Sequence, residues 1–327
     1  MAIKTLIEAV RETLADEMAR DERVILLGED VATKGGVFKA SDGLLDRFGE
    51  DRVIDTPLAE GGIIGVAVGA ALNGMRPIAE IQFADFIWPA MDQIVSEAAR
   101  MRYRTNGDFG CPMVIRTPYG GGVHGALYHS QSIEAMFYHV PGLKICAPAT
   151  PADAKGLLAA AIRDEDPVLF LEHKRLYRLI KGEVPAGEHL VPIGQADVKR
   201  AGDDLTIITY GAMLHLALEA AEQLAREGIS AEILDLRTIA PLDRDAIAAS
   251  VQKTSRALIL HEDTRTGGVG AEISAFLSEE LFDSLDAPIV RVTAPDVPAM
   301  PYNRGLEQAF LPQLDDLLTA VRRLAAY

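Results

Sequence analysis

A single glutamate in an apolar, glycine-rich stretch is the first residue whose surroundings suit chemistry. Glu60 follows the extended segment 55–59 and precedes the glycine-rich segment 61–65, and no further charged residue occurs before Arg76. Apolar surroundings disfavour the charged form of a carboxyl group, which keeps an acid protonated near neutral pH. The same position also suits an acid at the start of a helix, where the helix dipole stabilises negative charge. The spacing alone leaves both interpretations open.

A glycine-rich loop with two histidines is the second candidate. Residues 117–132 follow a predicted strand and contain aromatic residues, His124 and His129. Histidine is the usual proton carrier near neutral pH, and loops at strand ends often hold functional residues. Either histidine could instead be a structural residue at the helix predicted from Gln131, and the spacing does not separate the two. No cysteine or carboxylate stands at a ligand spacing to them or to His139, so zinc is not expected.

Other motifs are weaker or absent. The sequence has no Gly-x-x-x-x-Gly-Lys-Ser/Thr phosphate loop and no Gly-x-Ser-x-Gly nucleophile elbow. His261-Glu262 begins like a zinc-binding helix motif but lacks the second histidine. Gly268 and Gly270 match the first two glycines of a dinucleotide-binding loop, but the third is missing. A tight strand-to-helix turn is the favoured interpretation there, and a nicotinamide-binding protein is the alternative.

The elements that must position these residues alternate between strands and helices. The apolar spacing of residues 3–14 predicts a helix that Thr5 and Glu8 begin as a capping box. In the first half, strands are predicted at residues 24–27, 77–83, 113–116, 144–146 and 168–172. Helices are predicted at residues 61–72, from Pro89, and over 150–163, where Thr150 and Pro151 form a strong start signal.

A second alternation of strands and helices follows a stretch rich in glycine and proline. In the second half, strands are predicted at residues 205–209, 229–236, 257–261 and 289–292, and helices at 213–227, 243–252, 269–282 and 314–324. Repeated strand–helix units imply parallel sheets covered by helices. The fold class is therefore α/β with two doubly wound domains, at 1–185 and 203–327, joined by a linker at 186–202. Ligands of such sheets bind at the carboxyl ends of the strands.

The composition excludes several function classes. The chain has 327 residues and a formal net charge of -16, which argues against nucleic-acid binding and suits docking onto a basic partner. No apolar run of about 18 residues occurs, so no membrane span is expected. Only Cys111 and Cys146 are present, which do not make a disulfide framework in a chain of this length and indicate a reducing, cytoplasmic compartment.

Several segments together resemble the β subunits of the thiamine diphosphate-dependent decarboxylase component of 2-oxo acid dehydrogenase complexes. The resemblance covers essentially the whole chain, and its second half resembles the C-terminal domain of the transketolase superfamily. The segments that carry it are residues 26–31, 55–65, 79–86, 92–94, 125–132, 134–135 and 141–142. The resemblance implies a pyrimidine-binding thiamine diphosphate domain followed by a transketolase C-terminal-like domain.

The resemblance also implies roles for individual residues. Glu60 matches the catalytic glutamate that hydrogen-bonds the aminopyrimidine ring of the cofactor. Leu58 and Gln82 match residues of the same pocket, and Phe86 matches an aromatic residue that stacks on the pyrimidine and is often tyrosine. His129 matches the catalytic histidine that faces the substrate and the incoming lipoyl group. A potassium ion bound through backbone oxygens is implied near Val114, Ile115, Ala161, Asp164 and Asp166.

The diphosphate end of the cofactor is expected to lie on another chain. The family motif for diphosphate and magnesium, a Gly-Asp-Gly run followed by asparagine, is missing here. In heteromeric members the α subunit carries that motif. The resemblance therefore implies a cofactor site shared with an α subunit in an α2β2 heterotetramer, which docks on a lipoylated dihydrolipoyl acyltransferase core.

The expected reaction is the oxidative decarboxylation of a 2-oxo acid followed by reductive acylation of a lipoyl group. The stretches 83–86, 126–129 and 173–178 are nearer the branched-chain type, and the pyruvate type comes next. Half of a split transketolase or carboligase is an alternative within the same superfamily. A non-catalytic assembly subunit that retains only the fold is an alternative of a different class.

Overall fold

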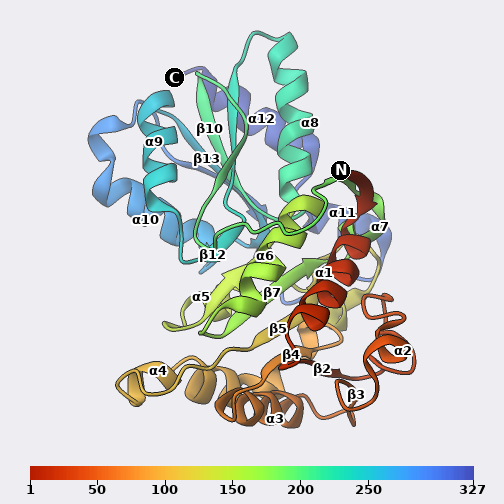
Figure 1. The fold of residues 1–327 in the computed structure, drawn as a ribbon. Helices are drawn as coiled ribbons and strands as arrows, with labels where there is room; N and C mark the ends of the chain where they lie inside the picture. Colours follow the sequence, from red (N-terminus) through yellow and green to blue (C-terminus); the bar gives the residue numbers. More distant parts are fainter. The chain divides into compact units, whose positions relative to one another are not determined.

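The computed structural model describes residues 1–327, which form two compact units (Figure 1). The first unit comprises Met1–Tyr119 and Met136–Ile193. The second comprises Gly120–Ala135 and Gly194–Tyr327. The glycine-rich loop with the two histidines is therefore part of the second unit, although the sequence places it within the first half of the chain.

The first unit is built on a sheet of parallel strands in the order β6-β7-β5-β4-β2-β3. Gly28 pairs with Asp55 on one side and with Glu80 on the other, so the carboxyl ends of three neighbouring strands lie level. The strands are β2 (Val24–Gly28), β3 (Val53–Asp55), β4 (Arg76–Glu80), β5 (Val114–Tyr119), β6 (Lys144–Cys146) and β7 (Val168–His173). A separate antiparallel pair joins β1 (Ala2–Thr5) to β8 (Lys181–Val184).

Two long helices of the first unit begin where the sequence signals predict. The helix α1 (Leu6–Arg20) starts at the Thr5 capping box, and α6 (Pro151–Arg163) starts at Thr150 and packs beside α1 (Figure 1). The glycine-rich helix α3 (Glu60–Leu72) packs against β4 and β2. The remaining short elements are α2 (Leu44–Phe48), η1 (Ala84–Phe86), η2 (Trp88–Ala90), η3 (Gln93–Ala98), α4 (Met101–Arg104), α5 (Glu134–Tyr138) and α7 (Leu176–Leu179).

The second unit has a five-stranded sheet in the order β14-β13-β10-β11-β9, which is parallel except for β9 at one edge. Its strands are β9 (Asp197–Arg200), β10 (Leu205–Thr209), β11 (Ala231–Asp235), β13 (Ala257–Thr264) and β14 (Val290–Ala294), with the short β12 (Thr238–Ala240) after β11. The helices α8 (Met213–Arg226) and α12 (Leu314–Ala325) pack together, and α9 (Arg244–Thr254) and α10 (Val269–Glu280) lie on the other side of the strands (Figure 1). The 3₁₀ turns η4 (Ala126–Tyr128) and η5 (Phe282–Ser284) and the helix α11 (Arg304–Phe310) complete the unit. The expected fold class, α/β with two doubly wound domains, is confirmed.

Local differences from the sequence prediction have physical causes. The strand predicted over 77–83 ends at Glu80. The chain leaves the sheet there and enters a 3₁₀ turn that begins at Ala84. The helix predicted from Pro89 divides into 3₁₀ and π segments. The strand β9 lies within the stretch predicted as a linker, because its backbone completes an edge of the second sheet. None of the helices combines the length and apolarity needed to cross a bilayer.

Candidate active site

Three of the predicted cofactor residues lie beyond the level carboxyl ends of β2, β3 and β4. Glu60 begins α3, shortly after β3 ends at Asp55. Gln82 follows the end of β4, and Phe86 is the last residue of η1. Ligands of parallel sheets bind at this kind of edge, because the loops there diverge and leave backbone groups available. The topology therefore gathers Glu60, Gln82 and Phe86 at one edge of the first sheet.

Glu60 is buried beside a second carboxyl group. It is only 9% exposed, and it is the first residue of α3, as the helix-end interpretation predicts. Burial, and then the charge of Glu60, raise the pKa of the Glu29 carboxyl above its ordinary value. Nearby along the chain, Oγ1 of Thr56 is buried and has no hydrogen-bond partner within the chain. Buried polar groups of this kind are normally satisfied, so the edge fits a polar ligand ring.

Aromatic rings and an exposed leucine surround the same edge. The ring of Phe86 meets that of Phe83 edge to face, with 5.9 Å between centroids, and Phe83 meets Phe38 in the same way at 5.6 Å. Edge-to-face contacts hold aromatic rings in defined orientations. Leu58, by contrast, is 79% exposed. Leu58, which the resemblance places in the cofactor pocket, is therefore exposed to solvent in this chain.

A buried ion-pair network lies in the strands that lead to this edge. The Arg116 guanidinium donates to both carboxyl oxygens of Glu172, at 2.6 and 2.8 Å, and to Glu80 at 2.8 Å. The hydroxyl of Tyr177 donates to Glu172 at 2.5 Å. Burial raises the pKa of Glu80, and the charge of Arg116 opposes that rise. The network joins the ends of β4, β5 and β7 just before Gln82, and sequence analysis did not identify it.

The histidine loop is fastened to the second unit by two carboxylates. The N–H of Gly121 donates to Oε1 of Glu262 at 2.6 Å. The N–H groups of Gly122 and His124 donate to Oε1 of Glu307 at 2.9 and 3.2 Å, and the His124 imidazole also contacts Glu307 through Nδ1. Glu307 therefore engages His124, one of the two histidines that the spacing could not separate.

His129 lies half-buried at the end of η4. A Cβ added at Gly125 would lie 2.8 Å from the Cβ of His129, so only glycine permits this close approach. Further along the loop, Glu134 accepts a hydrogen bond from the Tyr210 hydroxyl at 2.8 Å. Burial, and then the charge of Asp263, raise the pKa of Glu134 to about 8. Burial likewise raises the pKa of Asp263 to about 6.

The two glycines that resemble part of a dinucleotide-binding loop allow close packing of the chain against a buried histidine ring. Gly268 precedes α10, and Cβ atoms added at Gly268 and Gly270 would lie 2.8 and 2.7 Å from ring atoms of His261. His261 is buried against the Tyr210 ring, and this burial lowers the pKa of its imidazole to about 4. The tight strand-to-helix turn is therefore confirmed, and both glycines make room for a neutral histidine.

The residues predicted to bind potassium stand beside positive side chains. Arg76 donates to the backbone oxygens of Ile162 and Asp164, and the Lys144 ammonium contacts the Asp164 carboxylate at 2.7 Å. A carbonyl oxygen has a second lone pair, but these charges would repel a cation. The potassium site stays a prediction. No group of three or more histidine, cysteine, aspartate or glutamate side chains is placed to hold a metal ion.

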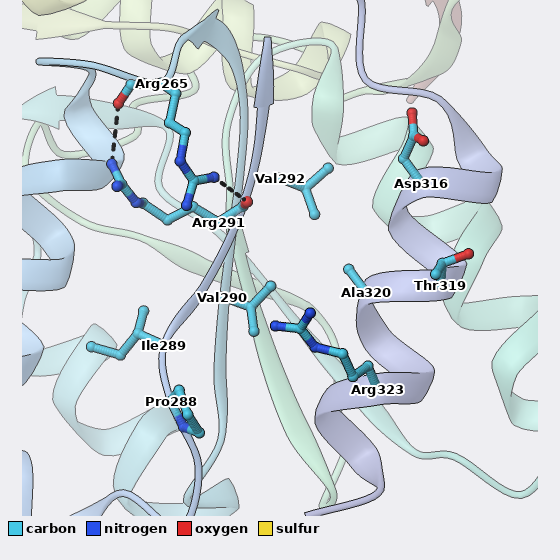
Figure 2. Close-up of a pocket in the computed structure, with 10 residues that line it drawn as sticks. All are labelled: Arg265, Pro288, Ile289, Val290, Arg291, Val292, Asp316, Thr319, Ala320 and Arg323. Carbon is cyan, nitrogen blue, oxygen red and sulfur yellow. Dashed lines mark hydrogen bonds between the residues drawn. The ribbon is translucent and has the colours of Figure 1, made fainter. Parts of the chain in front are cut away.

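A cavity of about 460 Å³ in the second unit lies away from all predicted site residues (Figure 2). It lies between β14 and α12, and three arginines stand around it. Arg265 and Arg291 each donate to the backbone oxygen of the other, so their guanidinium groups fasten β14 to the end of β13. Arg323 projects toward Val290 from α12.

Comparison with known proteins first defines the class. Residues 4–180 match the model of the transketolase pyrimidine-binding domain, and residues 194–317 match that of the transketolase C-terminal domain. Among solved structures, a split-gene transketolase described as an inactive β4 tetramer has a TM-score of 0.80 and 25% identity, with 98% of each chain covered. The chain is thus a two-domain protein of the transketolase type, whose relatives use thiamine diphosphate.

Curated relatives then define the family. The 2-oxoisovalerate dehydrogenase subunit beta of Bacillus subtilis is 59% identical over 327 residues, which is the whole of both chains. The pyruvate dehydrogenase E1 component subunit beta of the same species is 49% identical, again over the whole of both chains. This chain belongs to the β subunits of the 2-oxo acid dehydrogenase decarboxylase component, and it is part of that enzyme together with an α partner.

Proposed function

We propose that this chain supplies the pyrimidine-binding half of a decarboxylase that acts on branched-chain 2-oxo acids. The observation that carries the proposal is the buried Glu60 at the start of α3, at the same sheet edge as Gln82 and Phe86. A purely structural role at the helix start would explain the position of Glu60. It would not explain why Gln82 and Phe86 lie at the same sheet edge.

Each residue at this edge has a proposed task. Glu60 would hydrogen-bond the aminopyrimidine ring of thiamine diphosphate, Phe86 would press its face against the ring, and Gln82 would fix its orientation. Leu58 would form part of the apolar lining of the pyrimidine pocket once the α subunit covers it. The bound cofactor supplies an electron sink that permits loss of carbon dioxide. The protein's part is to position and polarise the cofactor.

The diphosphate and its magnesium ion would be held by the α subunit. The sequence has no phosphate-binding loop, no side-chain cluster is placed for a metal, and the net charge of -16 disfavours an unaided anion site. The high exposure of Leu58 next to Glu60 also fits a site that a second chain closes. We propose an α2β2 heterotetramer docked on a lipoylated acyltransferase core.

His129 would act after decarboxylation. Histidine is the usual proton carrier in enzymes, and reductive acylation forms a bond to one sulfur of the lipoyl disulfide while the S–S bond breaks, so the released sulfur must take up a proton. We assign His129 the role of acid–base catalyst in that transfer. His124 is engaged by Glu307 and has no catalytic task in this scheme.

A substrate panel tests the proposal. The chain would be co-purified with a candidate α subunit and assayed for decarboxylation of 2-oxoisovalerate, pyruvate and related 2-oxo acids. We expect kcat/KM for 2-oxoisovalerate to exceed that for pyruvate by about 10-fold or more, because a pocket for a branched side chain gains about 1–3 kcal/mol from the additional carbons. A preference for pyruvate would contradict the proposal that branched-chain 2-oxo acids are the substrates. Ketol transfer between sugars without decarboxylation would favour the carboligase alternative, which the split-gene transketolase likeness raises.

A further inference from the structure

We propose that Glu307 and Glu262 are positioning residues for His129, which they place by clamping the loop Gly120–Ala135. The inference rests on the proposed role of His129 and adds residues from a distant part of the sequence to the reaction. Glu307 does not stand out in the sequence, and Glu262 does so only as part of the incomplete zinc-binding motif at His261.

Glu307 holds the first half of the loop. It lies on α11 and is only 2% exposed. Its Oε1 accepts from the N–H groups of Gly122 and His124, and its Oε2 contacts the His124 imidazole. A buried carboxylate that accepts several N–H bonds forms strong, charge-assisted hydrogen bonds. Glu307 thus holds two backbone N–H groups and contacts one imidazole in the part of the loop that precedes His129.

Glu262 joins the two sides of the loop. Its Oε1 accepts from the N–H of Gly121 at 2.6 Å and from the hydroxyl of Ser132 at 3.5 Å. These two residues flank the segment that contains His129. Glu262, near the end of β13, therefore links the two ends of the loop at Gly121 and Ser132. Glu307 holds the segment between Gly122 and His124.

The loop has a strained backbone that external contacts can hold in place. Gly120 donates to Gln131 at 3.1 Å across the base, and His129 donates weakly to Ala126 at 3.4 Å. His124 and Ala126 both adopt left-handed backbone conformations, with φ of 56° and 58°. Such conformations are costly for residues other than glycine and persist only where the surroundings hold them. Without the clamp the loop would relax, and His129 would move.

The test separates loop geometry from chemistry. Glu307→Ala and Glu307→Gln chains would be assembled with the α subunit, and hydrogen exchange of residues 120–135 would be measured by mass spectrometry. Decarboxylation with an artificial electron acceptor and acyl transfer to a free lipoyl domain would be measured separately. Glu280→Ala, which alters an exposed glutamate on α10, is the matched control.

We expect Glu307→Ala to speed exchange in the loop and to slow acyl transfer by about 10- to 100-fold, because displacements near 1 Å have effects of this size. Decarboxylation should change by less than about 3-fold. Glu307→Gln keeps an acceptor oxygen and should recover most of the loss. If the alanine chain does not assemble, Glu307→Asp, which shortens the anchor, should give an intermediate loss.

Two results would overturn the inference: unchanged exchange in the loop of Glu307→Ala, or an equal fall of both rates. A His129→Ala chain separates this failure from failure of the proposed function. If His129→Ala acylates the lipoyl domain normally, the catalytic assignment of His129 is wrong, and the positioning role falls with it. If His129→Ala is impaired but Glu307→Ala and Glu307→Asp are not, the proposed function stands and only the clamp is wrong.

Discussion

At the scale of single residues, two buried glutamates show how surroundings assign different tasks to the same side chain. Glu60 begins a helix at the sheet edge where we propose that the cofactor binds, next to the carboxyl group of Glu29. Glu134 is enclosed with Asp263 and Glu262 and accepts a hydrogen bond from Tyr210. We propose that the first meets a ligand, whereas burial raises the pKa of the second to about 8.

The enclosed Glu134 makes stability depend on pH. Burial raises its pKa from 4.5 to about 8, so between these values the folded chain holds a proton that the unfolded chain has released. The free energy of unfolding should therefore fall as pH rises through this window, by at most about 1.4 kcal/mol per pH unit from this group. The Glu134→Gln side chain cannot ionise and keeps an acceptor for Tyr210. The free energy of unfolding of this variant, relative to that of the wild type, should therefore increase as pH rises from 5 to 8.

Denaturant unfolding at pH 5, 6.5 and 8 checks this prediction. Glu219→Gln, which alters an exposed glutamate on α8, should follow the wild type at every pH. Parallel profiles for Glu134→Gln and the wild type would show that Glu134 is already ionised in the folded chain.

Sequence reasoning found the residues of the site whose neighbours in the chain are unusual. Glu60 stands alone among apolar residues and glycines, so its surroundings were visible in the sequence. Glu307 and Arg116 were missed because their partners lie far along the chain, at Gly122 and at Glu172. The one available signal was a charge inside an otherwise apolar strand, which Glu80, Arg116 and Glu172 all show.

At the scale of elements, local signals predicted helix starts well and strand ends poorly. The Thr5 capping box and the Thr150-Pro151 start lie where the helices begin, because hydrogen bonds within a few residues determine those positions. The strand predicted over 77–83 was too long, because the apolar run continues into a 3₁₀ turn that packs on aromatic rings. The edge strand β9 was missed because its pairing with β11 is non-local.

The turn before α10 gives a prediction at this scale. A methyl group at Gly270 would lie 2.7 Å from the His261 ring, which is buried and has little room to move. Gly270→Ala should lower the free energy of unfolding by about 1–3 kcal/mol, the usual cost of overpacking a core. Gly69→Ala is the matched control, because it adds the same methyl group to α3 where nothing lies within 4 Å. That control should be neutral or stabilise by up to about 1 kcal/mol; equal effects of the two changes would contradict the packing role.

At the scale of the whole molecule, we propose that the chain forms the pyrimidine end of a cofactor site, while its sequence has no motif for the diphosphate end. It belongs to a family of β subunits, and its sequence lacks a phosphate-binding loop. Both catalytic candidates come from this chain, Glu60 from the first unit and His129 from the second. The account therefore requires that cofactor activation depend on Glu60 even when the α subunit holds the diphosphate.

Proton exchange at the thiazolium carbon of bound thiamine diphosphate tests this claim most directly. The chain and its α subunit would be assembled with the cofactor and magnesium, and exchange with heavy water would be followed by rapid quenching and NMR. The account predicts that Glu60→Gln still assembles and binds the cofactor but exchanges this proton at least about 100-fold more slowly, the scale of a lost acid–base contribution. An exchange rate equal to that of the wild type would contradict the role of Glu60.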